Sequence, residues 1–328
     1  MNAFSYFQPK DIDAAVRAGA ADDAKFLGGG TNLLDLMKGG IERPLKLIDV
    51  TRLPLATVEE LPNGGLRIGA GVRNSDAANH PLVRTRYPLL ADALLHGASA
   101  QLRNMATVGG NLMQRTRCHY FYDTGFSQCN KRAPGSGCAA LDGYNRMHAI
   151  LGASAQCIAT NPSDMSVALV ALDALVRVRG PDGERTIPAT DFHRLPGDTP
   201  HRDTNLAHGE LITAVDLPPS AFAEHSCYLK LRDRASYAFA LVSVAAALDL
   251  AGETVRGARI ALGGVAHKPW RVPEAEALLV GSRLARDRIE AAAARAVQGA
   301  KPYRDNAFKV ALAQRAIVRA VNTAAQSV

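Results

Sequence analysis

Short apolar runs and segments with a helical period follow one another along the first fifty residues. The pattern predicts strand, helix, strand, helix and strand over residues 4–6, 11–18, 25–27, 32–37 and 45–50. This alternation of strands and helices indicates a small α/β lobe, which we place at residues 1–55.

A second lobe follows, with a long irregular insertion inside it. Alternating apolar positions from 57 to 72 are interrupted by the turn Pro62-Asn63-Gly64-Gly65, which predicts a hairpin. The periodicity further predicts helices over 87–95 and 163–172 and strands over 175–178 and 210–217. Residues 114–160 show little apolar period, and a loop of this length is usually functional or disordered. We place this α/β lobe at residues 56–220, with the insertion at 114–160.

The last third of the chain has a different order of elements. Pro218 and Pro219 mark a boundary, after which strands precede helices. Strands are predicted over 227–231, 239–250 and 255–262, and Ala-rich helices over 273–280, 285–297 and 307–325. We therefore expect a C-terminal α+β domain over residues 221–328, built from a three-stranded antiparallel sheet and helices. The fold class predicted for the whole chain is also α+β.

Composition and charge narrow the class of protein. The chain has 328 residues, of which 47% are hydrophobic and 21% charged, which fits a soluble globular protein of two or three domains. The net charge is +7, but the basic residues are scattered and aromatics reach only 5%, which favours an anionic ligand or an acidic partner over a nucleic-acid groove. No run reaches the ~18 apolar residues of a membrane span, and the first residues lack the features of an export signal.

Two glycine-bearing turns are candidate phosphate-binding elements. The first is the strand, turn and helix start Lys25-Phe26-Leu27-Gly28-Gly29-Gly30-Thr31-Asn32-Leu33, and the second is Ala106-Thr107-Val108-Gly109-Gly110-Asn111. Glycines let a backbone approach a phosphate closely, and a helix start offers unpaired N–H groups. The first turn matches neither the dinucleotide fingerprint nor a P-loop, so a plain tight turn remains an alternative. For the second, the alternative is a turn in which Asn111 bonds its own backbone.

Four cysteines fall within forty residues of one another, inside or beside the insertion. Cys118, Cys129, Cys138 and Cys157 are separated by ten, eight and eighteen residues, whereas Cys227 stands alone in a predicted strand. The spacing matches neither zinc ribbons nor bacterial ferredoxins, yet four thiolates on a long loop can surround a [4Fe–4S] cluster. Two disulfides or inert buried thiols are the alternatives, and His119 is an alternative ligand.

Two further segments carry polar groups that suit a nucleotide. Asn161-Pro162-Ser163-Asp164 places a carboxylate at a helix start, where it is either an N-cap or a partner for a ribose or ribityl hydroxyl. The run from Tyr228 to Tyr237 carries alternating Lys and Arg, which form either a solvated face or a cationic partner of a pyrophosphate.

Taken together, these motifs resemble the FAD-binding (medium) subunits of the molybdenum hydroxylases, the xanthine dehydrogenase and carbon monoxide dehydrogenase family. The resemblance covers nearly the whole chain and is strongest to the flavin subunits of bacterial periplasmic aldehyde oxidoreductases. It rests on the two glycine turns, the cysteine-bearing segments, Arg232-Asp233-Arg234-Ala235-Ser236-Tyr237 and Gly263-Gly264-Val265-Ala266-His267-Lys268-Pro269-Trp270. It implies a two-lobed FAD-binding domain of the PCMH and xanthine dehydrogenase medium-subunit type, followed by the C-terminal domain.

The resemblance also implies a set of site residues. By similarity, the first turn holds the pyrophosphate of FAD, and other residues complete the flavin pocket. These comprise Lys25, Phe26, Leu27, Gly28, Gly29, Gly30, Thr31, Asn32 and Leu33, with Thr107, Gly110, Asn111, Ser163, Asp164, Ile212 and Lys230. In the aldehyde oxidoreductase subgroup the four cysteines, here Cys118, Cys129, Cys138 and Cys157, bind a [4Fe–4S] cluster, and 4-hydroxybenzoyl-CoA reductases also carry a cluster-bearing insertion.

The implied function is that of an electron-transfer subunit. A molybdenum-cofactor large subunit oxidises an aldehyde, [2Fe–2S] clusters of a small subunit carry the electrons, and FAD passes them to an external acceptor. The basic residues Arg115, Arg117, Lys131 and Arg132 would stabilise the anionic cluster or dock a partner, or serve solubility alone. The resemblance implies a periplasmic heterotrimer, exported with a signal-bearing partner, with the cytoplasm as the alternative. A flavin subunit of aryl-CoA reductase or xanthine dehydrogenase type and a zinc-stapled, non-redox binding protein are the alternative functions.

Overall fold

The N-terminal part of the computed structural model, which describes residues 1–326, is a small three-stranded parallel sheet with two helices. The sheet order is β1-β3-β2, and both β1 and β2 pair with the central strand β3 in parallel. The elements are β1 (Ser5–Phe7), α1 (Ile12–Gly19), β2 (Ala24–Leu27), α2 (Leu33–Lys38) and β3 (Lys46–Asp49). All five predicted elements of this lobe are therefore present, with ends that differ by at most one residue.

A five-stranded sheet with the order β4-β5-β8-β6-β7 forms the second part of the chain. Its strands are β4 (Val58–Glu60), β5 (Leu66–Gly69), β6 (Leu175–Gly180), β7 (Gly183–Pro188) and β8 (Leu211–Leu217). Every pair is antiparallel, and two of the pairs, β4 with β5 and β6 with β7, are hairpins. The α/β description predicted for this lobe is therefore wrong, and the hairpin strand β7 was not foreseen.

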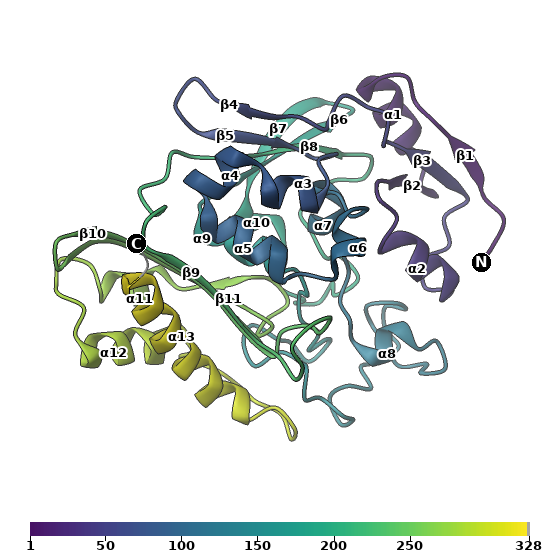
Figure 1. Ribbon diagram of the computed structural model, residues 1–328. Coiled ribbons are helices and arrows are strands. Elements are labelled where there is room, and N and C mark those ends of the chain that lie inside the picture. The colour runs from purple at the N-terminus through teal and green to yellow at the C-terminus, as the bar shows by residue number, and fades with distance from the viewer. Residues whose placement is uncertain (327–328) are drawn as a thin grey trace.

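Helices of this part lie largely against one face of the five-stranded sheet (Figure 1). The long ones, α5 (Pro88–His96) and α9 (Asp164–Ala171), match predicted helices, and the Ser163 hydroxyl caps α9 by accepting from the N–H of Ser166. The shorter helices are α3 (Asn74–Asn79), α4 (Pro81–Arg86), α6 (Ala100–Arg103), α7 (Val108–Leu112), α8 (His119–Tyr122) and α10 (Ala189–Phe192). They span only four to six residues, too few for a clear helical period in the sequence.

The C-terminal part is an antiparallel sheet with helices on one face. The sheet order is β12-β11-β10-β9, with strands β9 (Ser226–Leu231), β10 (Val242–Ala251), β11 (Thr254–Gly263) and β12 (Trp270–Arg271). The three predicted strands are present, and β12 adds two residues at the edge. The helices are α11 (Pro273–Ala277), α12 (Arg286–Ala296) and α13 (Phe308–Gln326).

The helices α5 and α9 lie between the five-stranded sheet and the C-terminal sheet, and α13 packs on the other face of the latter (Figure 1). All eight residues of α9 are buried, as expected for a helix enclosed on every side. Along β10, Val242, Val244 and Leu248 pack toward α13, whereas Ala245 and Ala247 join the core around α9. Small residues on that face let the helix approach the sheet, so one apolar core joins the two parts.

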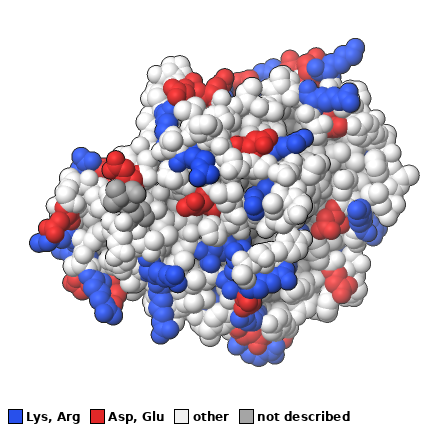
Figure 2. All heavy atoms as spheres, in the orientation of Figure 1, with Lys and Arg blue, Asp and Glu red and all other residues white. Residues whose placement is uncertain are grey.

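The insertion predicted at 114–160 is mostly irregular and contains the single turn of helix α8, at the lower right of Figure 1. On the face shown in Figure 2, Lys and Arg are interspersed with Asp and Glu, as the scattered charge in the sequence predicts. Among residues 1–326, no helix combines the length and the apolar character that a membrane crossing requires. The domain boundaries at 55 and 220 stay predictions, and residues 327–328 of the third segment lie outside the described residues.

Candidate functional site

The two glycine turns lie against each other. The first follows β2 and leads into α2, and the second leads into α7. A Cβ built at Gly29 would lie 1.8 Å from the carbonyl oxygen of Met105, and one at Gly28 would lie 2.9 Å from the hydroxyl of Thr107. Such contacts are possible only without a side chain, so the glycines bring the two turns into one cradle.

This cradle offers unpaired backbone donors. Within residues 1–326, the N–H groups of Gly29, Gly30, Thr31 and Asn32 donate to no protein acceptor, and these residues are half-buried. Gly30 has a φ of 74°, a conformation that side chains disfavour. Consecutive N–H groups without partners suit the oxygens of a phosphate, so the residues fit the pyrophosphate of FAD.

The side chain of Asn32 bonds to other parts of the protein. Its Oδ1 accepts from the backbone N–H of Arg115 at 2.9 Å, and its Nδ2 donates to the hydroxyl of Tyr122 at 3.1 Å. Its amide therefore joins the glycine turn to the start of the insertion. Lys25, at the other end of the motif, is exposed and lies 3.8 Å from Glu42.

The second turn is fixed by its own side chains. The Thr107 hydroxyl accepts from the N–H of Gly110 at 3.1 Å, and Asn111 Oδ1 accepts from the hydroxyl of Ser163 at 2.7 Å. Asn111 thus bonds α9 rather than its own backbone through its side chain. The turn and the start of α9 are held together, which places Thr107, Asn111 and Ser163 side by side.

Asp164 is the centre of a buried polar cluster. Its Oδ1 accepts from the Tyr228 hydroxyl and its Oδ2 from Lys230 Nζ, both at 2.7 Å. Lys230 also donates to the carbonyl of His96 at 3.0 Å. Burial, followed by the charge of Asp164, raises the pKa of Tyr228 well above its usual value. Lys230 therefore neutralises a carboxylate here, and the prediction that it faces a pyrophosphate has no support from its contacts.

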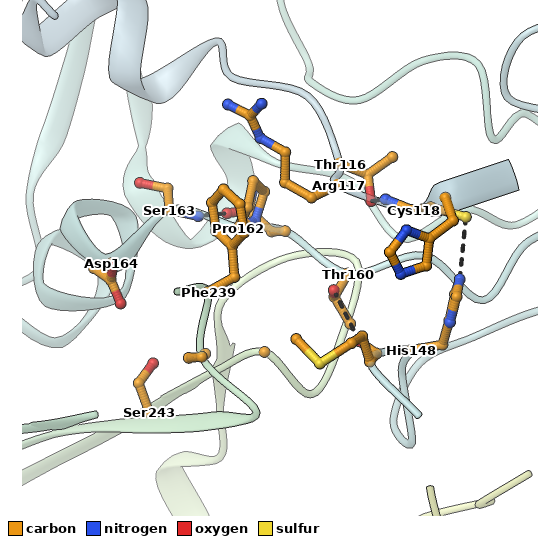
Figure 3. A pocket seen from close by; sticks show the side chains of 16 residues that line it. Thr116, Arg117, Cys118, His148, Thr160, Pro162, Ser163, Asp164, Phe239 and Ser243 are labelled. Carbon is orange, nitrogen blue, oxygen red and sulfur yellow. Dashed lines mark hydrogen bonds between the residues drawn. The ribbon is translucent and has the colours of Figure 1, made fainter. Parts of the chain in front are cut away.

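A cavity of about 110 Å³ opens beside this cluster, between the start of α9, the segment 116–119 and the loop before β10 (Figure 3). Ser163 and Asp164 line one side, and Cys118 and His148 line the other. Phe239 and the stem of Arg117 contribute apolar surface. An opening with apolar walls and a few polar groups suits an aromatic ring system.

The predicted flavin residues therefore fall into groups. Those of the cradle and the cavity edge lie together, whereas Ile212 lies in β8 with its side chain in the core and borders neither cavity of the site. The individual FAD contacts stay predictions. The structure adds Tyr228, which sequence reasoning missed because a Tyr in a buried strand is usually a core residue.

The four cysteines of the insertion line one second, smaller cavity of about 10 Å³. All are free thiols, so the predicted alternative of two disulfides is wrong in this structure. Cys129 and Cys138 face each other across an isolated antiparallel bridge, and Cys118 and Cys157 complete the wall. Among the described residues, no group of three or more His, Cys, Asp or Glu side chains converges to hold a single metal ion.

The sulfurs are largely buried and lie near backbone donors. Burial raises the pKa of Cys118 to about 12 and that of Cys157 to about 11, so both thiols are protonated at neutral pH without a metal. Hydrogen bonds from backbone N–H groups of Phe121 and Tyr120 act in the opposite direction on Cys118, as does the N–H of Ala159 at 3.4 Å from Cys157 Sγ. Such donors stabilise thiolates when a metal displaces the protons.

His148 contacts the cysteine group. Sequence reasoning missed this residue because the thirty positions between it and Cys118 match no ligand-spacing motif. Its Nε2 lies 3.1 Å from Cys118 Sγ. Burial lowers the pKa of His148 to about 4, so the ring is neutral. Cys118 lines both cavities, which places the two sites next to each other. His119, the alternative ligand, is exposed and has no contact with a sulfur among the described hydrogen bonds.

The basic residues of the insertion are paired inside the protein. Arg115 Nε lies 2.7 Å from Asp203, which also pairs with the buried Lys131, and Arg115 contacts Glu42 as well. Arg132 donates to four backbone carbonyls between 120 and 126. Solubility alone therefore does not explain these residues, because Arg115 and Lys131 hold the insertion to Glu42 and Asp203 and Arg132 stabilises a turn inside it.

Comparisons with known proteins indicate that the chain binds FAD. Residues 2–220 match the family model described as the FAD binding domain in molybdopterin dehydrogenase, and residues 227–324 match the CO dehydrogenase flavoprotein C-terminal domain. The chain is 53% identical to the aldehyde oxidoreductase FAD-binding subunit PaoB of Escherichia coli, over 97% of this chain and 96% of that protein. It is 27% identical to the glyceraldehyde dehydrogenase medium chain of Sulfolobus acidocaldarius, covering 92% and 90%.

Solved structures of this family share the fold of the chain. Carbon monoxide dehydrogenase from Hydrogenophaga pseudoflava superposes with a TM-score of 0.78 at 29% identity, covering 100% of this chain and 99% of that one. The match includes the FAD-binding part and the C-terminal part together. With sequence, fold and glycine cradle in agreement, the chain belongs to the FAD-binding subunits of the molybdenum hydroxylase family.

Proposed function

We propose that this chain is the FAD- and [4Fe–4S]-containing electron-transfer subunit of a heterotrimeric, molybdenum-dependent aldehyde oxidoreductase. The observation that carries the proposal is the group of four free cysteines around one cavity that adjoins the flavin cavity at Cys118. The 53% identity to an aldehyde oxidoreductase subunit over nearly the full length supports the substrate class.

The cysteine group fits a cluster better than a single ion. In a [4Fe–4S] cluster each iron takes one thiolate at its own corner, so the sulfurs need not converge on one point. A tetrahedral zinc site requires that convergence at about 2.3 Å, which the described side chains lack. The space of about 10 Å³ holds no more than about one water, so we infer that the cysteine cavity widens on cluster incorporation while Cys118 stays in contact with His148.

The residues of this chain would hold the cofactors and set their surroundings. When bound, FAD would collect electrons delivered by [2Fe–2S] clusters of a partner and release them to an external acceptor. The N–H groups of Gly29 to Asn32 would bind the diphosphate, and the cavity beside Asp164 would enclose the ring and exclude water. Backbone N–H groups around Cys118 and Cys138 would stabilise negative charge on the sulfurs.

Two alternatives fit less well. A zinc-stapled, non-redox binding protein does not explain the family match or the unpartnered donors of the cradle. A flavin subunit of the aryl-CoA reductase or xanthine dehydrogenase type has the same fold, and the xanthine dehydrogenase FAD-binding subunit XdhB of Escherichia coli is 25% identical to this chain. The higher identity to the aldehyde oxidoreductase subunit favours that class.

The proposal includes partners and a compartment. We infer that a molybdenum-cofactor large subunit and a [2Fe–2S] small subunit complete the enzyme, since the relatives are medium chains or subunits. We further propose export to the periplasm together with a signal-bearing partner. Fractionation of cells that express all three chains would test this, because recovery only in the cytoplasm would contradict it.

The deciding experiment compares two cysteine variants of the anaerobically purified complex. Cys138→Ser should lose about four irons and the matching sulfide per chain while FAD stays, because one corner ligand is gone. Cys227→Ser is the matched control, since this half-buried cysteine lies in β9 and lines neither cavity. Equal iron in the wild type and in Cys138→Ser would refute the cluster, and a complex without flavin would refute the whole proposal.

A further inference from the structure

We propose that His148 is a positioning residue whose Nε2–H donates a hydrogen bond to the Sγ of Cys118 and thereby raises the reduction potential of the cluster. The inference rests on the [4Fe–4S] cluster of the proposed function. It assigns a role to a side chain that belongs to neither the cysteine group nor the glycine cradle.

The hydrogen-bond partners of the ring determine its tautomer. His148 is 3% exposed, its Nε2 lies 3.1 Å from Cys118 Sγ, and its Nδ1 is buried without a partner among residues 1–326. A neutral imidazole carries one N–H, and a cysteine thiolate bound to a cluster can only accept a hydrogen bond. With Cys118 as such a ligand, the contact at Nε2 is a hydrogen bond when the ring proton resides on Nε2.

The backbone of His148 is anchored by the C-terminal part of the chain. Its carbonyl accepts from Asn306 Nδ2 at 3.2 Å and from Lys309 Nζ at 2.9 Å, and its N–H donates to the carbonyl of Asn145 at 3.0 Å. Both Asn306 and Lys309 are fully buried, and Lys309 also donates to the carbonyl of Gly264. These bonds anchor the backbone from which the ring reaches the sulfur.

The hydrogen bond from His148 to Cys118 lies between the two cofactor sites. Cys118 and His148 together form one wall of the flavin cavity, and Cys118 also lines the cysteine cavity (Figure 3). A donor to a ligand sulfur stabilises the more negative, reduced state of a cluster, which raises its potential. We expect loss of the donor to change the ratio of reduced to oxidised cluster at a fixed potential on the order of tenfold, which is about 59 mV for a one-electron couple.

Two substitutions separate the hydrogen bond from packing. His148→Phe keeps a ring beside Tyr120, whose centroid lies 6.2 Å away, but removes the donor. His148→Gln retains an N–H donor on its side-chain amide. His225→Phe is the control, because that histidine bonds to the carbonyl of Ala324 on α13 and lines neither cavity.

The measurement is an EPR-monitored redox titration of the purified complex, together with iron and sulfide per chain. His148→Phe should keep its iron and titrate at a more negative potential, whereas His148→Gln should lie between it and the wild type, and His225→Phe should match the wild type. An unchanged potential in iron-replete His148→Phe would overturn the role.

Loss of iron from a His148 variant and loss of iron from the wild type lead to different conclusions. If His148→Phe loses its iron, His148→Gln decides: iron with a near wild-type potential supports the role, and loss of iron in both variants overturns it in favour of a structural one. A wild-type complex without iron and sulfide overturns the proposed function itself, and this inference with it.

Discussion

Gly29 is the position at which the flavin cradle is most sensitive to a single methyl group. In Gly29→Ala the new Cβ would lie 1.8 Å from the oxygen and 2.6 Å from the carbon of the Met105 carbonyl. An ordinary Cβ contact begins at 3.4 Å, so the two turns would have to separate by about 1.6 Å, the difference between the two distances. No side-chain rotation relieves this clash, because both atoms belong to the backbone.

The displacement would move the unpartnered N–H groups that follow Gly29. Hydrogen bonds to charged groups contribute about 1.5–3 kcal/mol each, so the loss of two would cost about 3–6 kcal/mol of FAD binding. Because 1.4 kcal/mol is tenfold in affinity, we expect FAD to bind roughly 10²- to 10⁴-fold more weakly. The variant should consequently lose most of its flavin during purification.

The assay is the flavin-to-protein ratio after gel filtration, followed by titration of the apoprotein with FAD. Gly257→Ala is the matched control, since a Cβ there would lie 3.5 Å from Asp249 Cβ, an ordinary contact in β11. A folded Gly29→Ala protein with the wild-type ratio and affinity would show that the cradle does not bind the diphosphate.

Two further predictions concern the buried charges. Asp203→Asn leaves Lys131 buried without its carboxylate and leaves Arg115 with Glu42 alone. The free energy of unfolding should therefore fall by about 3–5 kcal/mol and the melting temperature by on the order of 10 °C, whereas Asp13→Asn, in an exposed pair with Arg179, should change little. Burial raises the pKa of Asp203, but the nearby cations outweigh it and hold the pKa well below its usual range. Because the pKa is lower in the folded state than in the unfolded state, this stabilisation should be complete above about pH 4 and be lost as the pH falls further. A difference in stability between wild type and Asp203→Asn that persists at the lowest pH would contradict this reasoning. Lys230→Met leaves the buried Asp164 carboxylate without its counter-charge, so the melting temperature of the apoprotein should fall further than in the double variant with Asp164→Asn; equal falls would mean that the ion pair is not the cause.

Local patterns in the sequence were enough to locate the glycine cradle and most of the long elements. A strand, three glycines and a helix start within nine residues, and the conformational freedom of glycine is a property of the residue itself. The sequence cannot show which glycine is indispensable. That depends on Met105, whose carbonyl reaches Gly29 only when the second turn folds back against the first.

Partners distant in the sequence could not be predicted. The pairing of Arg115 with Asp203 joins residues 88 positions apart, and the contact of His148 with Cys118 spans 30. Neither has a spacing signal, because loops without a period carry no information about what they pack against. The antiparallel order of the five-stranded sheet was missed for a similar reason, since β7 is mostly exposed and has little apolar alternation.

The small residues Ala245, Ala247 and Ala261, on which α9 rests, bear on how the protein can be taken apart. A fragment that stops at residue 220 would leave Val167, which lies against Gly263 of β11, and that side of the buried helix facing water along the surface that β10 and β11 now cover. A chimera that takes its last hundred residues from a distant relative must keep these alanines. One added methylene group at any of them would displace α9, and with it the Asp164 carboxylate at the start of that helix. Chimeras and truncations should therefore treat both parts as one folding unit.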